Sequence, residues 1–406
     1  MDLGRARYLV SERGGRDLAG LPEGLAELPP TALATRLRRE YAPPEASALA
    51  EQVTHRARAR RRFGTHGDLL FTREGLEMMT HPAVAARRAG RLAEAGARIV
   101  DATCGLGGDL RACSWGATAA VGFDHDPVAA LLAARNVPSA SVARADATRL
   151  PIEVRGVALL LDPQRRGERG RRFDPAAFSP AWDECLALGA AARIASLKGP
   201  PGLPHAQVPP AAEVEFVQVG RSLREATVWL DGAGRERADG RPLRRAVLLP
   251  QEAILASTEP EASATCQAPS AVVFDPEGCV TRAGLVRHLG ARLSASLLDP
   301  QVAYLTAEHA AHDPLASTFA VLDVAPFSVA RLRTRLRERG WRPEEIRRRA
   351  FPVEPDELRR LLGRLEGDPV TLLCTTIQDR RTVIIARRLR APESSEAPLV
   401  PGVARQ

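Results

Sequence analysis

The middle of the chain alternates short apolar runs with longer alanine-rich segments, and this pattern predicts buried strands joined by helices. The apolar runs are Arg98–Asp101, Ala119–Phe123, Val157–Leu161 and Arg193–Leu197. Continuous apolar runs of this length are typical of parallel strands that are covered on both faces. Residues 76–245 therefore predict an α/β domain, which Glu215–Val219 and Ala226–Leu230 extend as an antiparallel pair.

The first 75 residues follow a looser helical period and predict a helical, basic N-terminal region (1–75). Leu33, Leu37 and the segment 48–53 set this period, and the run 55–62 then concentrates arginines just before Phe63. A charge run of this kind is either a solvated helix face or a contact for RNA.

The last third predicts a small α/β module at 321–390, which follows a connecting segment at 246–320. In the module, helices are expected at Ser328–Arg339 and Glu354–Leu365, and strands at Glu345–Phe351, Val370–Ile377 and Thr382–Ala386. In the connecting segment, a strand is expected at Ala246–Leu249 and a helix at Leu285–Leu297. The tail 391–406 is rich in Pro, Glu and Ser, which predicts disorder.

Composition restricts the class of protein. The 406 residues are 45% hydrophobic and 26% charged, the balance of a soluble globular protein. The apolar stretches are far shorter than the roughly 20 residues that a membrane-spanning helix needs. Six cysteines without CxxC spacing favour reduced thiols over disulfides or a zinc site. The sequence therefore predicts a cytoplasmic protein with no membrane segment and no metal.

The net charge is +8, from 57 basic and 49 acidic residues. Such an excess is compatible with a nucleic-acid partner. Lys198 is the only lysine, so an arginine-rich composition without functional meaning explains the charge equally well. Aromatic residues make up 4% of the chain, so any platform for base stacking must use few side chains.

The strongest local signal is a glycine-dense turn directly after an expected strand. Asp101 ends the strand, and Gly105 and Gly107 let the backbone approach a ligand closely. A dinucleotide-binding turn would need a third glycine where Leu110 stands, and a P-loop would need a lysine. An acidic strand end followed by a spaced glycine pair instead resembles the first motif of class I S-adenosylmethionine-dependent methyltransferases.

Three further aspartates follow at or near the ends of later strands. Asp124 is placed to accept hydrogen bonds from ribose hydroxyls, and Asp146 stands where such folds hold an adenine amino group. Asp162 begins an Asp-Pro pair at the position of a target base. Asp126 is expected to cap the next helix, with Pro127 in its first turn. Any one of these aspartates alone would be interpreted as a cap or turn residue. Because each of them stands at or near a strand end, together they favour a nucleoside-binding site.

Residues 71–245 resemble the bacterial class I methyltransferases related to trimethylguanosine synthase. The segments that carry this likeness are Phe71–Leu76 with Thr80, Asp101–Asp109, Gly170–Arg172, Lys198–Leu203 and Glu215–Val217. In that branch a THUMP-like domain follows the catalytic domain. The segments similar to it are Asp275-Pro276, Arg282–Val286, Leu298–Pro300, Pro326–Ser328 and Pro352–Pro355.

The resemblance implies a Rossmann-like class I methyltransferase domain, S-adenosylmethionine as cofactor and RNA as partner. The expected cofactor-binding residues are Asp101, Thr103, Gly105, Gly107, Asp124 and Asp146. Asp162 and the Pro163 carbonyl are expected to accept the protons of the target, and positioning supplies most of the rate. The expected substrate contacts are Arg165, Arg166 and Lys198.

The acceptor atom and the function class stay open at this point. Enzymes that methylate exocyclic amines usually place an aromatic residue after Asp-Pro, whereas this chain has Gln164 and Arg165. Stacking could come from Phe173, Phe178 or Trp182. The alternatives are a non-catalytic RNA-binding scaffold, and a methyltransferase that acts on a small molecule or a protein. A nicotinamide dehydrogenase is opposed by Leu110.

Overall fold

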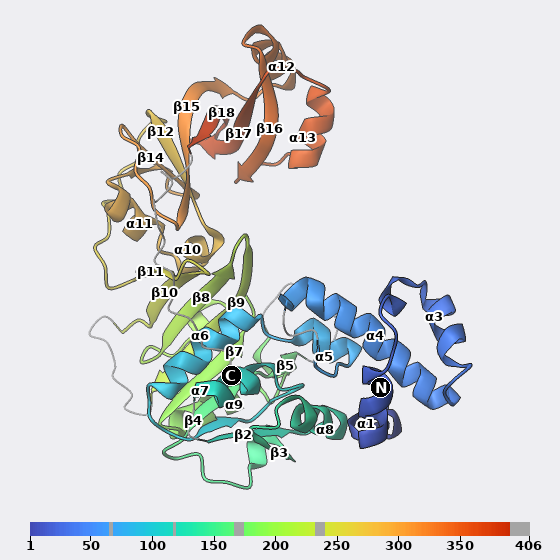
Figure 1. The fold of residues 1–406 in the computed structure, drawn as a ribbon. Helices are drawn as coiled ribbons and strands as arrows, with labels where there is room; N and C mark the ends of the chain where they lie inside the picture. Colours follow the sequence, from blue (N-terminus) through green and yellow to red (C-terminus); the bar gives the residue numbers. More distant parts are fainter. Residues whose placement is uncertain (65–67, 117–118, 166–173, 232–239, 390–406) are drawn as a thin grey trace, which may run out of the picture. The chain divides into compact units, whose positions relative to one another are not determined.

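Two compact units make up the chain, Met1–Leu243 and Arg244–Gln406 (Figure 1). The computed structural model describes residues 1–64, 68–116, 119–165, 174–231 and 240–389. The predicted disordered tail, 391–406, lies outside the described residues.

The first unit combines N-terminal helices with an α/β sheet. Its helices are α1 (Leu3–Val10), α2 (Glu12–Ala19), α3 (Pro30–Leu37), α4 (Pro43–Phe63), α5 (Arg73–Met78), α6 (Pro82–Ala93), α7 (Gly108–Gly116), α8 (Pro127–Asn136) and α9 (Trp182–Ala191). Its strands are β1 (Ile99–Asp101), β2 (Ala120–Asp124), β3 (Ser141–Arg144), β4 (Ala158–Leu161), β5 (Gln164–Arg165), β6 (Phe178–Ser179), β7 (Ile194–Gly199), β8 (Glu213–Val219) and β9 (Ser222–Asp231).

The sheet of this unit runs in the order β8-β9-β7-β4-β1-β2-β3. Strands β7, β4, β1, β2 and β3 are parallel, while β9 pairs antiparallel with both β7 and β8. The predicted α/β architecture and the predicted antiparallel pair are therefore confirmed. Strand β3 was missed because its four residues are mostly exposed and lack an apolar run. In a parallel sheet the carboxyl ends of neighbouring strands meet at one edge, where ligands bind.

The N-terminal helices share a hydrophobic core with the part of the chain that precedes and follows β1. Buried Leu49 and Phe71 belong to one cluster with Leu76, Leu106 and Leu132. The basic run of α4 also faces this region. The guanidinium of Arg56 donates to the backbone carbonyls of residues 68 and 69, and that of Arg62 donates to those of residues 76 and 77. These two arginines of the charge run therefore fasten the 68–77 segment to α4.

The second unit is built on another sheet. Its helices are α10 (Gly278–Ala283), α11 (Val286–Leu293), α12 (Val329–Glu338) and α13 (Pro355–Leu362). Strands β10 (Leu243–Leu249) and β11 (Ala253–Ala256) pair antiparallel with each other and are not part of this sheet. The sheet is formed by β12 (Val272–Pro276), β13 (Ser296–Asp299), β14 (Val302–Ala307), β15 (Ala316–Pro326), β16 (Trp341–Arg349), β17 (Asp368–Ile377) and β18 (Arg380–Leu389). The sheet order is β13-β14-β12-β15-β18-β17-β16, in which β16 and β17 are parallel. The predicted helices at 328–339 and 354–365 correspond to α12 and α13.

The predicted single helix Leu285–Leu297 is wrong in its second half. Helix α11 ends at Leu293 because Ser294 takes a left-handed backbone conformation with φ of 50°, and the amide of Ala295 bonds back to the carbonyl of Gly290. The chain then enters strand β13. Strands β12 to β14 also lie in the stretch 246–320, where polar turns obscured the apolar pattern. Within the described residues, no helix combines the length and apolar character needed to cross a membrane.

We predict that Asn136→Leu lowers the free energy of unfolding of the first unit by about 3 kcal/mol, because buried backbone groups lose their partners. The Asn136 amide bonds the amide and carbonyl of Leu70 at 2.7 and 3.0 Å and the carbonyl of Leu106 at 2.9 Å. Urea unfolding followed by the fluorescence of buried Trp182 and Trp229 measures the change.

The control is Ser139→Ala, at an exposed position in the turn that follows α8, three residues after Asn136. Its effect should stay within about 0.5 kcal/mol. Equal unfolding curves for the two variants would contradict the structural role assigned to Asn136.

Candidate functional site

The loop between β1 and α7 is tied to both neighbouring strands. The amide of Cys104 donates to the carbonyl of Phe123 at 2.8 Å, and the amide of Gly105 donates to Asp124 Oδ2 at 2.8 Å. On the other side, the hydroxyl of Thr103 accepts from the amide of Asp162 at 2.6 Å. The loop therefore holds the ends of β1, β2 and β4 in one arrangement.

Two glycines of this loop have backbone conformations that other residues rarely adopt. Gly105 has φ of +52°, and a Cβ there would meet no atom within 4 Å, so the backbone faces open space. Gly107 has φ of +87°, and its Cβ would lie 2.7 Å from Cγ2 of Val137. The first glycine leaves room for a ligand, and the second permits close packing on α8.

Two cavities open at this edge of the sheet. One of about 230 Å³ is lined by the turn after β1, by α5 and by the carboxylates of Asp101, Asp109 and Asp162. The other, of about 320 Å³, is lined by Asp124, Asp146 and the β6 region. Residues common to both are Thr103, His125, Asp162 and Gln164. Five of the predicted cofactor residues thus border this space; Gly107 lies behind it, in the loop.

The aspartates of the second cavity are engaged by the backbone. Asp124 is buried and accepts from the amides of Gly105 and Asp126, at 2.8 and 2.9 Å. Asp146 caps a short 3-10 turn, and the amide and hydroxyl of Thr148 lower its pKa. Asp126 accepts from the amide of Val128 and caps α8, as predicted.

Asp101 is the most strongly perturbed carboxylate of the site. Its side chain is 1% exposed, and the amide of Thr103 donates to it at 3.2 Å. Burial raises its pKa well above the ordinary value, and the nearby charge of Asp109 raises it further. A cationic group placed in the cavity would reverse this effect.

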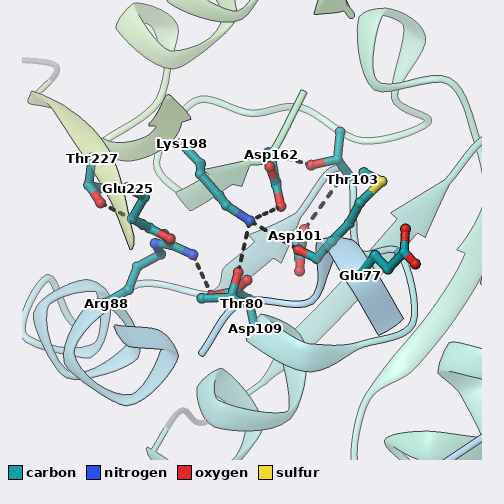
Figure 2. A network of polar contacts seen from close by, with 12 residues as sticks. Glu77, Thr80, Arg88, Asp101, Thr103, Asp109, Asp162, Lys198, Glu225 and Thr227 are labelled. Atoms are coloured by element: carbon teal, nitrogen blue, oxygen red, sulfur yellow. Dashed lines mark hydrogen bonds and ion pairs between the residues drawn. The ribbon is translucent and has the colours of Figure 1, made fainter. Parts of the chain in front are cut away.

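Lys198 and Asp162 form an ion pair next to the first cavity (Figure 2). Nζ of Lys198 lies 2.7 Å from Asp162 Oδ2, 3.1 Å from the hydroxyl of Thr80 and 3.5 Å from the carbonyl of Met78. Burial alone would lower the pKa of Lys198, but Asp162 and the more distant Glu225 outweigh burial and raise it. Lys198 therefore carries a positive charge beside the Asp-Pro motif.

Behind this pair lies a second, fully buried group of charges. The two terminal nitrogens of Arg88 bond Asp109 and Glu225, and the hydroxyl of Thr227 donates to Glu225 at 2.8 Å. Arg88 is 2% exposed, and burial opposes its charge while Asp109 and Glu225 raise its pKa.

Sequence reasoning missed Arg88 and Glu225, although a signal for Arg88 existed. In α6 it shares the buried stripe of Val84, Ala85, Ala89 and Leu92, so the helical period predicts a buried arginine. Glu225 stands just before the predicted strand Ala226–Leu230, whereas strand β9 begins at Ser222 and includes it.

The other predicted residues are placed as follows. Pro163 is buried, and Gln164 and Arg165 form the short strand β5, which pairs with β6. Arg166 and Phe173 lie outside the described residues. Trp182 is fully buried and Phe178 packs on it, with ring centroids 5.7 Å apart.

Cys185 is a packed thiol and does not act as a nucleophile. Its side chain is 1% exposed, and burial raises its pKa to about 12. The thiol is therefore protonated.

Comparison with known proteins points to one family. A family model described as THUMP domain-like matches residues 316–388. The chain is 35% identical over 316 residues to an uncharacterized S-adenosylmethionine-dependent methyltransferase of Mycobacterium tuberculosis, in two strains, covering 76% of this chain and 85% of the relative. A crystal structure of a proposed methyltransferase from Porphyromonas gingivalis W83 superposes with a TM-score of 0.72 at 20% identity, covering 90% of this chain and 96% of the other.

We predict that Asp124→Ala weakens binding of S-adenosylmethionine at least about 10-fold, because the Gly105 loop loses a charge-assisted hydrogen bond. Isothermal titration calorimetry measures the affinity. The exposed carboxylate of Glu153 provides the control, and Glu153→Ala should bind as the wild type does. Unchanged affinity of Asp124→Ala would remove Asp124 from the cofactor site.

We further predict that Asp101→Asn stabilises the ligand-free protein more as the pH rises. In the folded state the raised pKa lets Asp101 keep a proton that the unfolded chain releases near its ordinary pKa of about 4. The free energy of unfolding of the wild type therefore decreases as the pH rises from that value through the pKa of Asp101 in the folded state. The asparagine variant has no proton to lose at this position, so it lacks this decrease. Unfolding of both proteins at pH 5, 7 and 8 gives the difference, and a difference independent of pH would contradict the raised pKa.

Proposed function

The chain belongs to the S-adenosylmethionine-dependent methyltransferases, and we propose that it methylates a nucleotide in RNA. The observation that carries this proposal is the THUMP-like match over 316–388, because THUMP domains are RNA-binding modules. The finer subtype, the bacterial relatives of trimethylguanosine synthase, and a cytoplasmic location belong to the same proposal.

The residues at the edge of the first sheet fit the cofactor. S-adenosylmethionine supplies an electrophilic methyl group on a cationic sulfonium. The carboxylates of Asp101, Asp109 and Asp162 border the cavity of about 230 Å³, so it favours a ligand with positive groups. Asp124 and Asp146 border the adjoining cavity, where we place the nucleoside. The open backbone at Gly105 leaves space between the two.

The surface of the THUMP-like region supports an RNA partner. Helix α12 exposes Arg331 and Arg337, and α13 exposes Arg360. On the buried sides of the two helices lie Leu332 and Leu336 of α12 and Leu358 and Leu362 of α13. Guanidinium groups displayed in this way suit contacts with phosphates.

A basic hollow in the first unit supports the same partner. A cavity of about 440 Å³ is lined by Arg111, Arg135, Trp115 and Asp68, and by Arg56, whose guanidinium is bonded to the carbonyls of residues 68 and 69. Trp115 is 69% exposed, and the guanidinium of Arg111 lies 5.3 Å from its ring centroid. An exposed tryptophan among arginines can stack on an unpaired base while the arginines hold the backbone.

The proposal predicts transfer of labelled methyl groups from S-adenosylmethionine to total RNA taken from a strain that lacks the gene. The label should be released by ribonuclease and not by protease. We expect Asp162→Ala to abolish transfer while it keeps cofactor affinity within about threefold, because positioning at this residue acts on the transfer step.

Other outcomes would replace the proposal. Label released only by protease would indicate a protein substrate. Cofactor binding with no labelled macromolecule would indicate a small-molecule substrate, and RNA binding without cofactor binding would indicate a scaffold. Loss of both affinity and activity in Asp162→Ala would place Asp162 in the cofactor site.

A further inference from the structure

We propose that the methyl acceptor is an oxygen, the 2′-hydroxyl of a ribose in RNA, with Asp162 accepting its proton and Lys198 stabilising its negative charge. The inference rests on the proposed RNA function and adds the acceptor atom. Its basis is the ammonium group of Lys198, which lies 2.7 Å from the carboxylate of Asp162 at the cavity where transfer would occur.

The sign of the charge that develops during transfer distinguishes oxygen from nitrogen. An amine that attacks a methyl sulfonium gains positive charge, so a fixed ammonium beside it opposes the reaction. A hydroxyl that loses its proton gains negative charge, and a preorganised cation stabilises it in a site that excludes water. The Lys198–Asp162 pair therefore suits a hydroxyl, since it offers a proton acceptor and a cation at one point.

Arg88 directs Lys198 to Asp162. Asp109 and Glu225 also act on Lys198 and could each attract the ammonium. Both are already bonded to the guanidinium of Arg88, which is 2% exposed. Lys198 is thereby left with Asp162 as its carboxylate partner among the described residues. Arg88 acts as a positioning residue because, among the described residues, it bonds Asp109 and Glu225 and neither Asp162 nor Lys198.

The division of roles follows from the protonation of Lys198. The carboxylate next to it raises its pKa, so the amine is charged and cannot itself take the proton of the acceptor. Asp162 binds Lys198 through Oδ2, whereas its Oδ1 has no hydrogen-bond partner among the described residues. That oxygen is available to accept the hydroxyl proton.

The two cavities have one exposed flat ring among the described residues that line them. Phe178, the one phenyl, phenol or indole side chain there, is 7% exposed, and its ring packs against Trp182. The imidazole of His125 lines both cavities and is 64% exposed. The lining therefore offers a base at most this one imidazole to stack on.

In the transfer step, the ribose O2′ forms a bond to the methyl carbon while the carbon–sulfur bond breaks and its electron pair stays on sulfur. The hydroxyl proton passes to Asp162, which then releases it to water. The products are a 2′-methoxy ribose and S-adenosylhomocysteine, so atoms and charge balance.

The chemistry of the labelled product tests the acceptor. A 2′-methoxy group blocks alkaline cleavage of the neighbouring phosphodiester, so label should appear in alkali-resistant dinucleotides. Once the site is mapped, an oligonucleotide with 2′-deoxyribose at that position should accept no label. Label in mononucleotides would overturn the oxygen assignment and leave the RNA function intact. Absence of label from RNA would overturn both.

Variants of Lys198 test its role. Lys198→Met should lower kcat about 100-fold or more, because a charge that stabilises the oxyanion is lost. Calorimetry without RNA should find cofactor affinity within about threefold of wild type, since the pair is expected to act on the acceptor.

Lys198→Arg keeps a positive charge and should retain more activity than Lys198→Met. The exposed Arg155 supplies the matched control, and Arg155→Met should match the wild type in every measurement. Activity of Lys198→Met within about twofold of wild type would overturn the assigned role of Lys198.

Discussion

The buried charges between α6 and the carboxyl edge of the first sheet are the constraint on which the site depends. Removing an arginine and several carboxylates from water is costly unless every charge is paired. Arg88 meets this requirement by bonding Asp109 of α7 and Glu225 of β9 at once. These bonds join helix, loop and sheet, and removing Arg88 would leave two buried carboxylates without the cation that they share.

Neighbouring ion pairs extend this attachment along α6. Arg87 bonds Glu215 at 2.8 Å, and Arg91 bonds Glu213 and lies over the ring of Trp229 at 4.2 Å. The same helix follows directly after Thr80, which accepts from Lys198. Fixing α6 to strands β8 and β9 thus also fixes one wall of the catalytic cavity.

Charge distribution separates the two tasks of the first unit. Carboxylates border the space assigned to the cofactor, whose sulfonium is cationic, whereas the outer hollow around Trp115 is lined by arginines that suit phosphates. Lys198, which is bonded to Asp162 next to the first cavity, carries the one ammonium side chain in the sequence. The ammonium of a lysine is a compact charge on a flexible side chain, so it can approach a single reacting atom. The planar guanidinium of an arginine binds best when two acceptor atoms face it.

The sequence by itself determined the class of fold, the glycine turn and the aspartates at the strand ends, because period and turn chemistry are local properties of the chain. It also predicted the cap at Asp126 and singled out Lys198 by composition alone. It could not determine that Lys198 meets Asp162, 36 residues away, or that Arg88 joins Asp109 to Glu225, 137 residues away from Arg88. Those contacts depend on which strands lie next to one another and on where buried charges find partners, and only the tertiary structure decides both.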